Sequence, residues 1–246
     1  MTWEPYRGST VVGDVRVLRG ERDLYAYLPP SHGSGRRFPL LVMHDGLNLF
    51  DEPISNNGEW QVDETMEALA GEGLEAVVVG VPHGPDRSRE YAGRKGSAAY
   101  LRYLVDTVVP LARDSFDLDT RRESTGLLGS SLGGVISLHG LYSERDTFGL
   151  AGVFSPAFWV NGGRLFDVVA NEDPPAARIY MDVGTNESDD DETRRAYADD
   201  FERMRALLAQ RGFGDDRLLT VLDDGGVHHE TAWARRLPAA LRFLLS

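Results

Sequence analysis

The chain has 246 residues, 41% of them apolar, which is enough to build the core of one large α/β domain or two small ones. Its formal net charge of −13 opposes binding to polyanions, so we expect neither nucleic acid nor an anionic membrane surface as a partner. The sequence contains no cysteine, which excludes disulfides, thiolate metal sites and cysteine nucleophiles.

The opening segment, MTWEPYRGST, lacks the basic and apolar regions of a secretory signal. No stretch approaches the roughly 20 apolar residues that a membrane-spanning helix needs. We therefore expect a cytoplasmic protein. Internal repeats and low-complexity linkers are absent from the sequence, and the polar cluster at 31–37 is only long enough for a loop. One domain over residues 1–246 is the simplest prediction.

In chain order, the first predicted elements are an antiparallel pair of strands at 10–18 and 23–28, where Val, Leu and Tyr partly alternate with polar residues. Short runs that are mostly apolar on both faces follow, which is typical of parallel strands covered by helices on either side. These runs lie at 38–43, 74–81, 124–128, 150–154, 178–183 and 217–222.

Helical spacing of apolar residues appears between and after these runs. It extends over 97–116, where Pro110 predicts a kink, over 194–211, where Gly212 can end the helix, and over 231–245. The order predicts an α/β fold in which strands and helices alternate around one mostly parallel sheet.

A possible nucleophile lies in Gly129-Ser130-Ser131-Leu132-Gly133, which fits GxSxG with Ser131 at its centre. A predicted strand runs into this motif and a helical segment at 135–142 follows it. A strand, a tight turn and a helix are what a nucleophile elbow requires, and the helix N-terminus favours developing negative charge. The alternative is a glycine-rich turn with an incidental serine.

A serine nucleophile needs a histidine to accept its proton and a carboxylate to orient that histidine. In the order serine, acid, histidine, the base must follow the last predicted strand. Four histidines lie too early for this role, namely His32, His44, His83 and His139. His228 and His229 follow a predicted turn at 223–226, and spacing alone leaves the choice between them open.

The orienting acid is expected at the carboxyl end of a strand between the serine and the histidine. The predicted strand at 178–183 contains Asp182 and leads to Glu187 and Asp189–Asp191. Five carboxylates therefore compete, although the last three suit the N-terminus of the following helix.

Two backbone N–H groups are also needed to bind the oxyanion of the tetrahedral intermediate. One is expected from Leu132, the residue after the serine. The other is expected from the loop after the strand at 38–43, where Leu47 is the best candidate; a simple turn is the alternative.

Six motifs extend this pattern over nearly the whole chain, from about Leu40 to Leu245. They are HDGLNLF (44–50), SREY (88–91), GSSLGG (129–134), FSPAFW (154–159), DVGTNE (182–187) and HHETAW (228–233). With these motifs the sequence resembles the putative-esterase family of α/β hydrolases. That family includes enterochelin esterase-like proteins, bacterial feruloyl esterases and mycobacterial mycolyltransferases.

The resemblance implies a three-layer α/β-hydrolase fold and selects among the open alternatives. It implies Ser131, Glu187 and His228 as the catalytic residues, with Leu47 and Leu132 as oxyanion amides. His229 stands where an asparagine is commoner. Four aromatic residues are expected as walls of the substrate pocket, namely Trp60, Tyr91, Phe158 and Trp159.

The sequence therefore predicts a serine esterase without a large cap domain, acting on a small soluble ester, with no metal and no cofactor. An acyltransferase using the same residues and an inactive binding protein of the same fold are alternatives. A metal-dependent hydrolase built on His228, His229 and the acidic run is a third, although neighbouring side chains ligate one ion awkwardly and HExxH is absent. The physiological ester, the acyl acceptor and the oligomeric state stay open.

Overall fold

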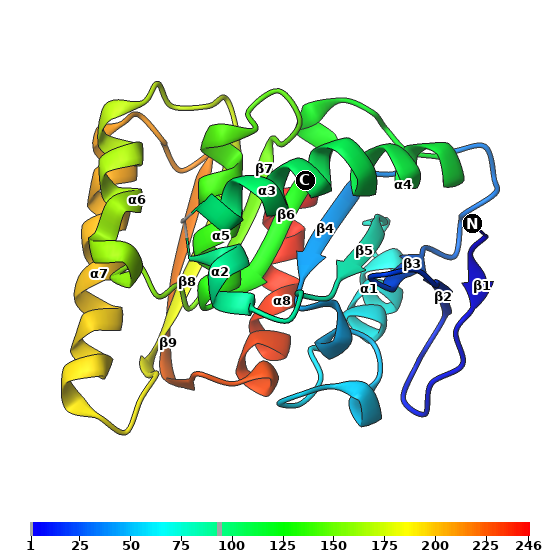
Figure 1. Ribbon diagram of the computed structural model, residues 1–246, viewed down its shortest axis with the longest axis horizontal. Coiled ribbons are helices and arrows are strands. Elements are labelled where there is room, and N and C mark those ends of the chain that lie inside the picture. Colours follow the sequence, from blue (N-terminus) through cyan, green and yellow to red (C-terminus); the bar gives the residue numbers. More distant parts are fainter. Residues whose placement is uncertain (1, 93–94) are drawn as a thin grey trace.

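The computed structural model describes residues 2–92 and 95–246, and its strands form one sheet in the order β1-β2-β3-β5-β4-β6-β7-β8-β9 (Figure 1). Strands β1 to β3 are antiparallel to their neighbours, and all pairings from β5 to β9 are parallel. The strands are β1 (Glu4–Pro5), β2 (Asp14–Leu18), β3 (Leu24–Leu28), β4 (Leu40–His44), β5 (Val77–Val81), β6 (Thr125–Ser130), β7 (Leu150–Phe154), β8 (Arg178–Asn186) and β9 (Leu218–Val227).

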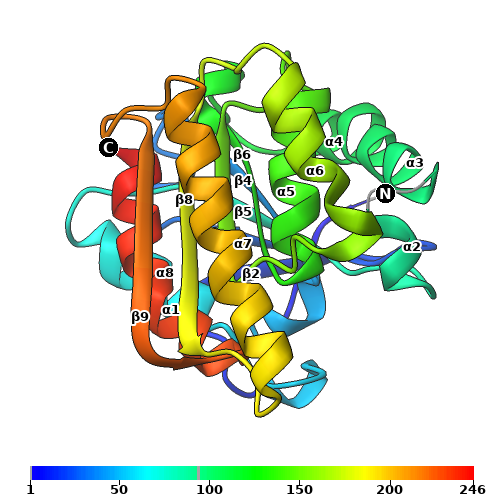
Figure 2. The ribbon, with the colours of Figure 1, turned by 90° about the vertical axis from the view of Figure 1, so that its left-hand side faces the viewer.

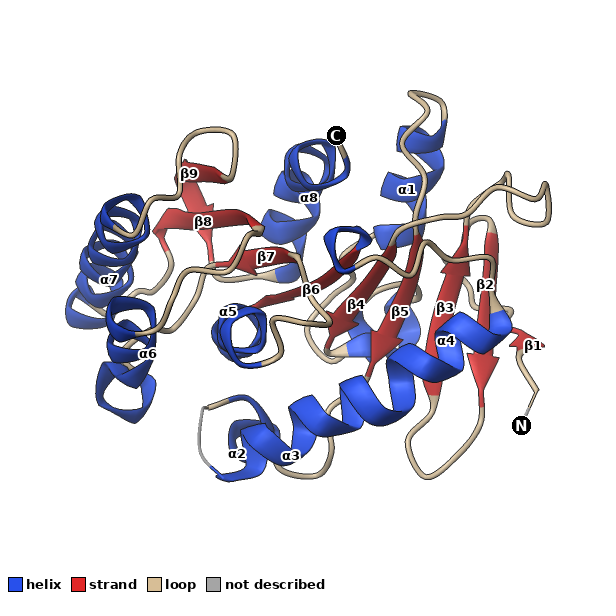
Figure 3. Cartoon of the chain, turned by 90° about the horizontal axis from the view of Figure 1, so that it is seen from above, coloured by secondary structure: helices blue, strands red, loops and turns tan. Residues whose placement is uncertain are grey.

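Helices cover both faces of this sheet, as Figure 3 shows from above. The face with α1 and α8 lies opposite the face with the other helices. The α-helices are α1 (Val62–Ala70), α2 (Arg87–Tyr91), α3 (Lys95–Tyr103), α4 (Val109–Ser115), α5 (Leu132–Ser143), α6 (Val160–Asn171), α7 (Asp191–Gln210) and α8 (Glu230–Leu245). The predicted three-layer α/β-hydrolase fold is confirmed.

Burial of the central strands explains why their sequences are apolar throughout. Every residue of β4, β5, β6 and β7 is buried, because helices pack on both sides of the sheet. The two faces form two cores. Leu127 and Val153 belong to the core under α5, whereas Leu128 and Phe154 belong to the core under α8. Burial of this apolar area is the main force that holds the layers together.

The predicted helix over 97–116 is a continuous helical path with an irregular turn. Helix α3 leads into a π-helical turn, η3 (Leu104–Val108), and α4 begins directly before Pro110. Proline has no N–H to donate within a helix, so a widened turn before it accommodates the missing hydrogen bond. This agrees with the predicted irregularity at Pro110.

The predicted turn at 223–226 is wrong, because β9 continues through these residues to Val227. Figure 2 shows β8 and β9 side by side along their length. Their pairing shifts register between Gly184 and Asn186, and Gly225 has a positive φ of 73°. The glycines therefore form an irregularity within a strand. Over residues 2–92 and 95–246, no helix combines the length and the apolar character needed to cross a lipid bilayer.

Candidate active site

Ser131 occupies a strained turn between β6 and α5. Its backbone has φ 57° and ψ −121°, in a region that residues other than glycine rarely adopt. Its N–H donates to the carbonyl of Phe154 at 2.9 Å, which ties the turn to the end of β7. A Cβ atom on Gly129 would lie 2.9 Å from the backbone of Gly133, so glycine is needed where the strand and helix meet. This is the geometry of a nucleophile elbow.

His228 and Glu187 form a hydrogen-bonded pair that joins the loop after β9 to the loop after β8. The distance from His228 Nδ1 to Glu187 Oε2 is 2.7 Å. The Glu187 side chain is completely buried, while a quarter of the His228 side chain is exposed. The pair therefore has the arrangement of a histidine base with an orienting carboxylate.

The second oxygen of Glu187 is held by donors from the protein. Glu187 Oε1 accepts from the N–H of Gly184 at 2.5 Å and from the hydroxyl of Ser155 at 2.5 Å. Ser155 Oγ in turn accepts from Trp233 Nε1 at 2.9 Å and from Arg236 Nη2 at 2.8 Å. With its one proton given and both lone pairs occupied, the serine hydroxyl has a fixed orientation. Glu187 therefore has little freedom to move away from His228.

Asp182 belongs to the same buried network but has other contacts. Its carboxylate accepts from the N–H of Ser155 and the hydroxyl of Tyr180, and it lies 3.2 Å from Arg236 Nε. Burial raises the pKa of Asp182 to about 7, against the opposing attraction of Arg236. His228 Nδ1 is hydrogen-bonded to Glu187 and not to Asp182.

The three aspartates after Glu187 lie at the start of α7. Asp190 accepts from the N–H of Thr193 at 2.8 Å and caps the helix, as the helix-capping interpretation of these residues expected. Asp189 is exposed, and Asp191 pairs with Arg194.

Tyr197, on α7, contacts the remaining nitrogen of His228. Its hydroxyl lies 3.3 Å from His228 Nε2. Burial raises the pKa of Tyr197 to about 12, against a lowering effect of the nearby Ser131 side chain, so this hydroxyl stays protonated at neutral pH. No motif in the sequence pointed to this residue, because only the packing of α7 against the sheet brings it here.

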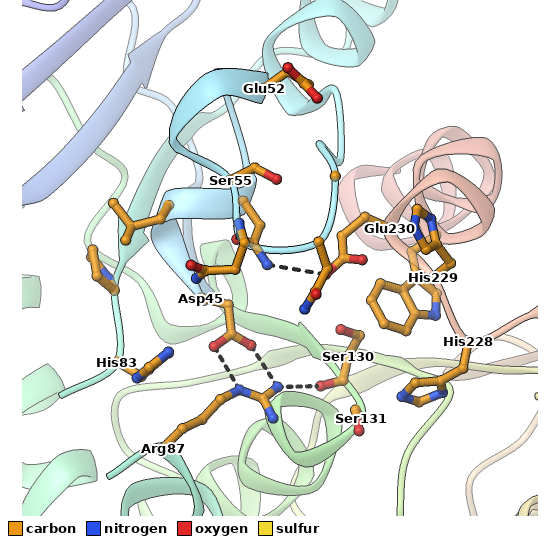
Figure 4. A pocket seen from close by; sticks show the side chains of 17 residues that line it. Asp45, Glu52, Ser55, His83, Arg87, Ser130, Ser131, His228, His229 and Glu230 are labelled. Atoms are coloured by element: carbon orange, nitrogen blue, oxygen red, sulfur yellow. Dashed lines mark hydrogen bonds and ion pairs between the residues drawn. The ribbon is translucent and has the colours of Figure 1, made fainter. Parts of the chain in front are cut away.

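A cleft of about 900 Å³ opens over Ser131 and His228 (Figure 4). Leu47 lines the same cleft, and Leu132, the first residue of α5, directly follows the serine. The lining residues are Asp45, Leu47, Asn48, Glu52, Ser55, Asn56, Asn57, Gly58, Pro82, His83, Arg87, Ser130, Ser131, His228, His229, Glu230 and Trp233. The structure thus brings Ser131, His228 and Leu47 to one cavity.

Two charged contacts in the cleft were not predicted. Arg87 holds Asp45 through two hydrogen bonds of 2.8 Å and also approaches the carbonyl of Ser130 at 3.4 Å. Asn48 donates to Glu230 at 3.1 Å, which joins the loop carrying Leu47 to the start of α8 (Figure 4). Burial raises the pKa of Glu230. The sequence offers only a weak indication that these two residues belong to the site, because Arg87 directly precedes the SREY motif and Glu230 lies inside HHETAW.

Three of the four predicted pocket aromatics are buried and do not line the cleft. Trp60, Tyr91 and Phe158 are at most 3% exposed and lie in the core. Trp60, for example, packs against Phe154 and Trp233. Their motifs mark core packing, as is common for large aromatic side chains. Trp159 is 36% exposed and contacts the ring of Tyr197 edge-on, so it lies near the site without lining the cleft.

The two neighbouring histidines direct their Nδ1 atoms to different partners. His228 Nδ1 contacts Glu187, whereas His229 Nδ1 accepts from the N–H of Thr231 and caps α8. Among the described residues, His228 and His229 do not belong to a group of three ligand atoms close enough to hold one metal ion.

Comparisons with known proteins agree with this geometry. A model of the family described as "Putative esterase" matches residues 16–244. The uncharacterized protein YbbA of Bacillus subtilis is 25% identical over 234 residues, which cover 92% of this chain and 93% of that protein.

Solved structures share the fold. A ferulic acid esterase superimposes with a TM-score of 0.72 at 16% identity, covering 94% of this chain and 96% of that one. The enterobactin esterase FES from Shigella flexneri superimposes with a TM-score of 0.70 at 17% identity, covering 98% of this chain and 60% of that one. Because the family model spans nearly the whole sequence, the chain belongs to the "Putative esterase" family and is a carboxylic-ester hydrolase.

Proposed function

We propose that the chain hydrolyses esters by serine catalysis, with Ser131 as nucleophile, His228 as base and Glu187 as orienting acid. The observation that carries this proposal is the 2.7 Å hydrogen bond between His228 Nδ1 and Glu187 Oε2, beside a cleft that Ser131 lines. A carboxylate on Nδ1 keeps the proton on that nitrogen and leaves Nε2 free to accept one.

The reaction follows from these positions. Ser131 attacks the ester carbonyl and gives its proton to His228 Nε2, and the oxyanion is bound by the N–H groups of Leu132 and Leu47. His228 then protonates the leaving alcohol, which leaves an acyl group on Ser131. Water, activated by His228, attacks this acyl-enzyme and releases the acid.

Tyr197 must release His228 Nε2 before this nitrogen can accept the proton of Ser131. Its hydroxyl lies 3.3 Å from His228 Nε2, so it competes with the serine for the nitrogen that must accept the proton. Catalytic hydrogen bonds are often loose without substrate and tighten in the complex. We propose that the entering ester shifts Nε2 from Tyr197 to Ser131.

The proposed substrate is a small soluble ester with polar groups. The cleft of about 900 Å³ carries Asp45, Glu52, Arg87 and Glu230 in its wall, which suits a polar ligand better than a bulk lipid. A ferulic acid esterase and an enterobactin esterase share this fold, so related aromatic and siderophore esters belong in the first substrate panel.

Labelling with a fluorophosphonate, followed by intact mass, tests this function together with a panel of 4-nitrophenyl esters. We expect one adduct on the wild-type chain, and Ser131→Ala should lose both the adduct and turnover. Ser143→Ala is the matched control, because this exposed serine ends the same helix, and it should retain both. Turnover retained by Ser131→Ala would refute the mechanism.

A further inference from the structure

Three carboxylates gather at the start of α1, outside the proposed catalytic site. One oxygen from each of Glu59, Asp63 and Glu64 lies within 4.8 Å of the others. The segment before Glu59 lines the cleft through Glu52 and 55–58. The cluster therefore lies where a wall of the cleft joins the first helix.

Each of these side chains has one buried oxygen that accepts no hydrogen bond from a donor in the described part of the chain, namely Glu59 Oε1, Asp63 Oδ1 and Glu64 Oε2. Asp63 is completely buried and Glu59 is only 7% exposed. Unpaired buried oxygens are costly, and native structures rarely keep three together without something that binds them.

The N-terminal segment holds the other oxygens of two of these carboxylates. Thr10 Oγ1 donates to Glu59 Oε2 at 3.0 Å, and the N–H of Val12 donates to Asp63 Oδ2 at 2.6 Å. With one oxygen of each anchored, the remaining oxygens stay in the cluster. The carboxylates are thus fixed in place by the fold before any ligand arrives.

Within residues 2–92 and 95–246, no Lys, Arg or His side chain forms an ion pair with Glu59, Asp63 or Glu64. Three ionised carboxylates this close together repel one another. Keeping all three groups ionised therefore requires a compensating cation.

We propose that Glu59, Asp63 and Glu64 bind a divalent cation that prefers oxygen ligands, with Ca²⁺ as the best fit. Ca²⁺ takes carboxylate oxygens at about 2.3–2.6 Å, so two of its ligands can lie up to about 5 Å apart. The three oxygens within 4.8 Å satisfy this limit. Mg²⁺ holds its ligands at about 2.0–2.1 Å and needs a tighter octahedral arrangement. The cation would tie the N-terminal segment to the first helix.

Thermal unfolding of the full chain, freed of metal with a chelator and then dialysed, tests this site. We expect Ca²⁺ to raise Tm in a saturable way, by roughly 5–10 °C at about 100 times its Kd. Mg²⁺ should act more weakly, and NaCl of equal ionic strength should have no such effect. Isothermal titration with Ca²⁺ should give one site per chain.

Two variants distinguish a cluster held by a bound cation from one in which two carboxylates share a proton. Asp63→Asn and Glu64→Gln should abolish the Ca²⁺-dependent rise, and metal-free Asp63→Asn should be at least as stable as the metal-free wild type because repulsion is relieved. Glu192→Gln is the matched control, since Glu192 is an exposed carboxylate in the first turn of α7, and it should keep the full rise.

Two results would overturn the proposal: a wild-type Tm that neither Ca²⁺ nor Mg²⁺ changes beyond the salt control, or a full rise retained by both Asp63→Asn and Glu64→Gln. If one variant fails to fold, the other still decides. These measurements are independent of the ester chemistry at Ser131.

Discussion

Replacing Glu187 with glutamine should reverse the orientation of the proton on His228. The N–H of Gly184 and the hydroxyl of Ser155 both donate to Glu187 Oε1, so the amide oxygen of a glutamine must face them. The amide NH₂ then faces His228 Nδ1 in place of Oε2. A donor at this position requires Nδ1 to accept, which moves the imidazole proton to Nε2, where the serine needs an acceptor.

The size of the effect follows from this reversal. The wrong tautomer costs about 10⁴-fold in kcat in the well-studied serine triad, and a factor of 10 corresponds to about 1.4 kcal/mol. We therefore expect Glu187→Gln to lower kcat for a 4-nitrophenyl ester by about 10³- to 10⁴-fold. Because the amide oxygen keeps the donors of Gly184 and Ser155, we expect the free energy of unfolding to fall by only about 1–3 kcal/mol.

Steady-state kinetics combined with ¹⁵N NMR of the histidine side chains checks this prediction. The spectra should report a proton on Nδ1 of His228 in the wild type and on Nε2 in the variant. Asp189→Asn is the control, because this exposed carboxylate lies two residues away, and it should leave kcat unchanged. If Glu187→Gln keeps more than about a tenth of wild-type kcat, Glu187 is not the orienting acid.

Two further predictions concern a tyrosine hydroxyl and a buried histidine. Tyr197→Phe removes the hydroxyl that lies 3.3 Å from His228 Nε2. The rate of fluorophosphonate labelling of Ser131 should then rise by up to about tenfold, which corresponds to the free energy of one hydrogen bond. A fall in this rate of more than about 100-fold would instead indicate that the tyrosine carries a proton in the reaction. Burial lowers the pKa of His44 to about 4, whereas the same histidine in the unfolded chain has its ordinary pKa of about 6.5. As the pH falls from 6.5 towards 4, His44 therefore binds a proton in the unfolded chain but not in the folded one. This should reduce the free energy of unfolding by about 2 kcal/mol at pH 5 relative to pH 7. Urea unfolding at both pH values should show this loss in the wild type and not in His44→Gln; an equal pH dependence in the two proteins would contradict it.

The fold was predictable because burial leaves a direct trace in the sequence. Runs such as 150–154 are apolar on both faces only because helices cover both sides of the sheet, and β7 has these same bounds. Strand ends were less accurate, since β6 extends to Ser130 and β8 to Asn186. The pairing of neighbouring strands, which the sequence does not display, decides where a strand ends.

The candidate site was predictable only in part. Ser131 was proposed because a strained turn needs glycines at fixed offsets. Strand ends and chain order narrowed the acid to five carboxylates and the base to His228 or His229, and only the family resemblance selected Glu187 and His228. Arg87 and Tyr197 were missed because their contacts depend on how α2 and α7 pack. The predicted aromatic pocket residues do not line the cleft, because a motif does not distinguish an aromatic side chain in a core from one in a pocket.

The misread glycines of β9 explain how the acid reaches its histidine. A Cβ atom on Gly184 would lie 2.2 Å from the carbonyl oxygen of Gly226 and 2.9 Å from Glu187 Oε1. The backbones of β8 and β9 therefore meet directly beneath the carboxylate, and this close contact lets the N–H of Gly184 reach Oε1. A side chain at residue 184 would separate the strands that carry Glu187 and His228. Gly226, which belongs to the segment wrongly predicted as a turn, thus lets the strands that lead to Glu187 and His228 lie close together.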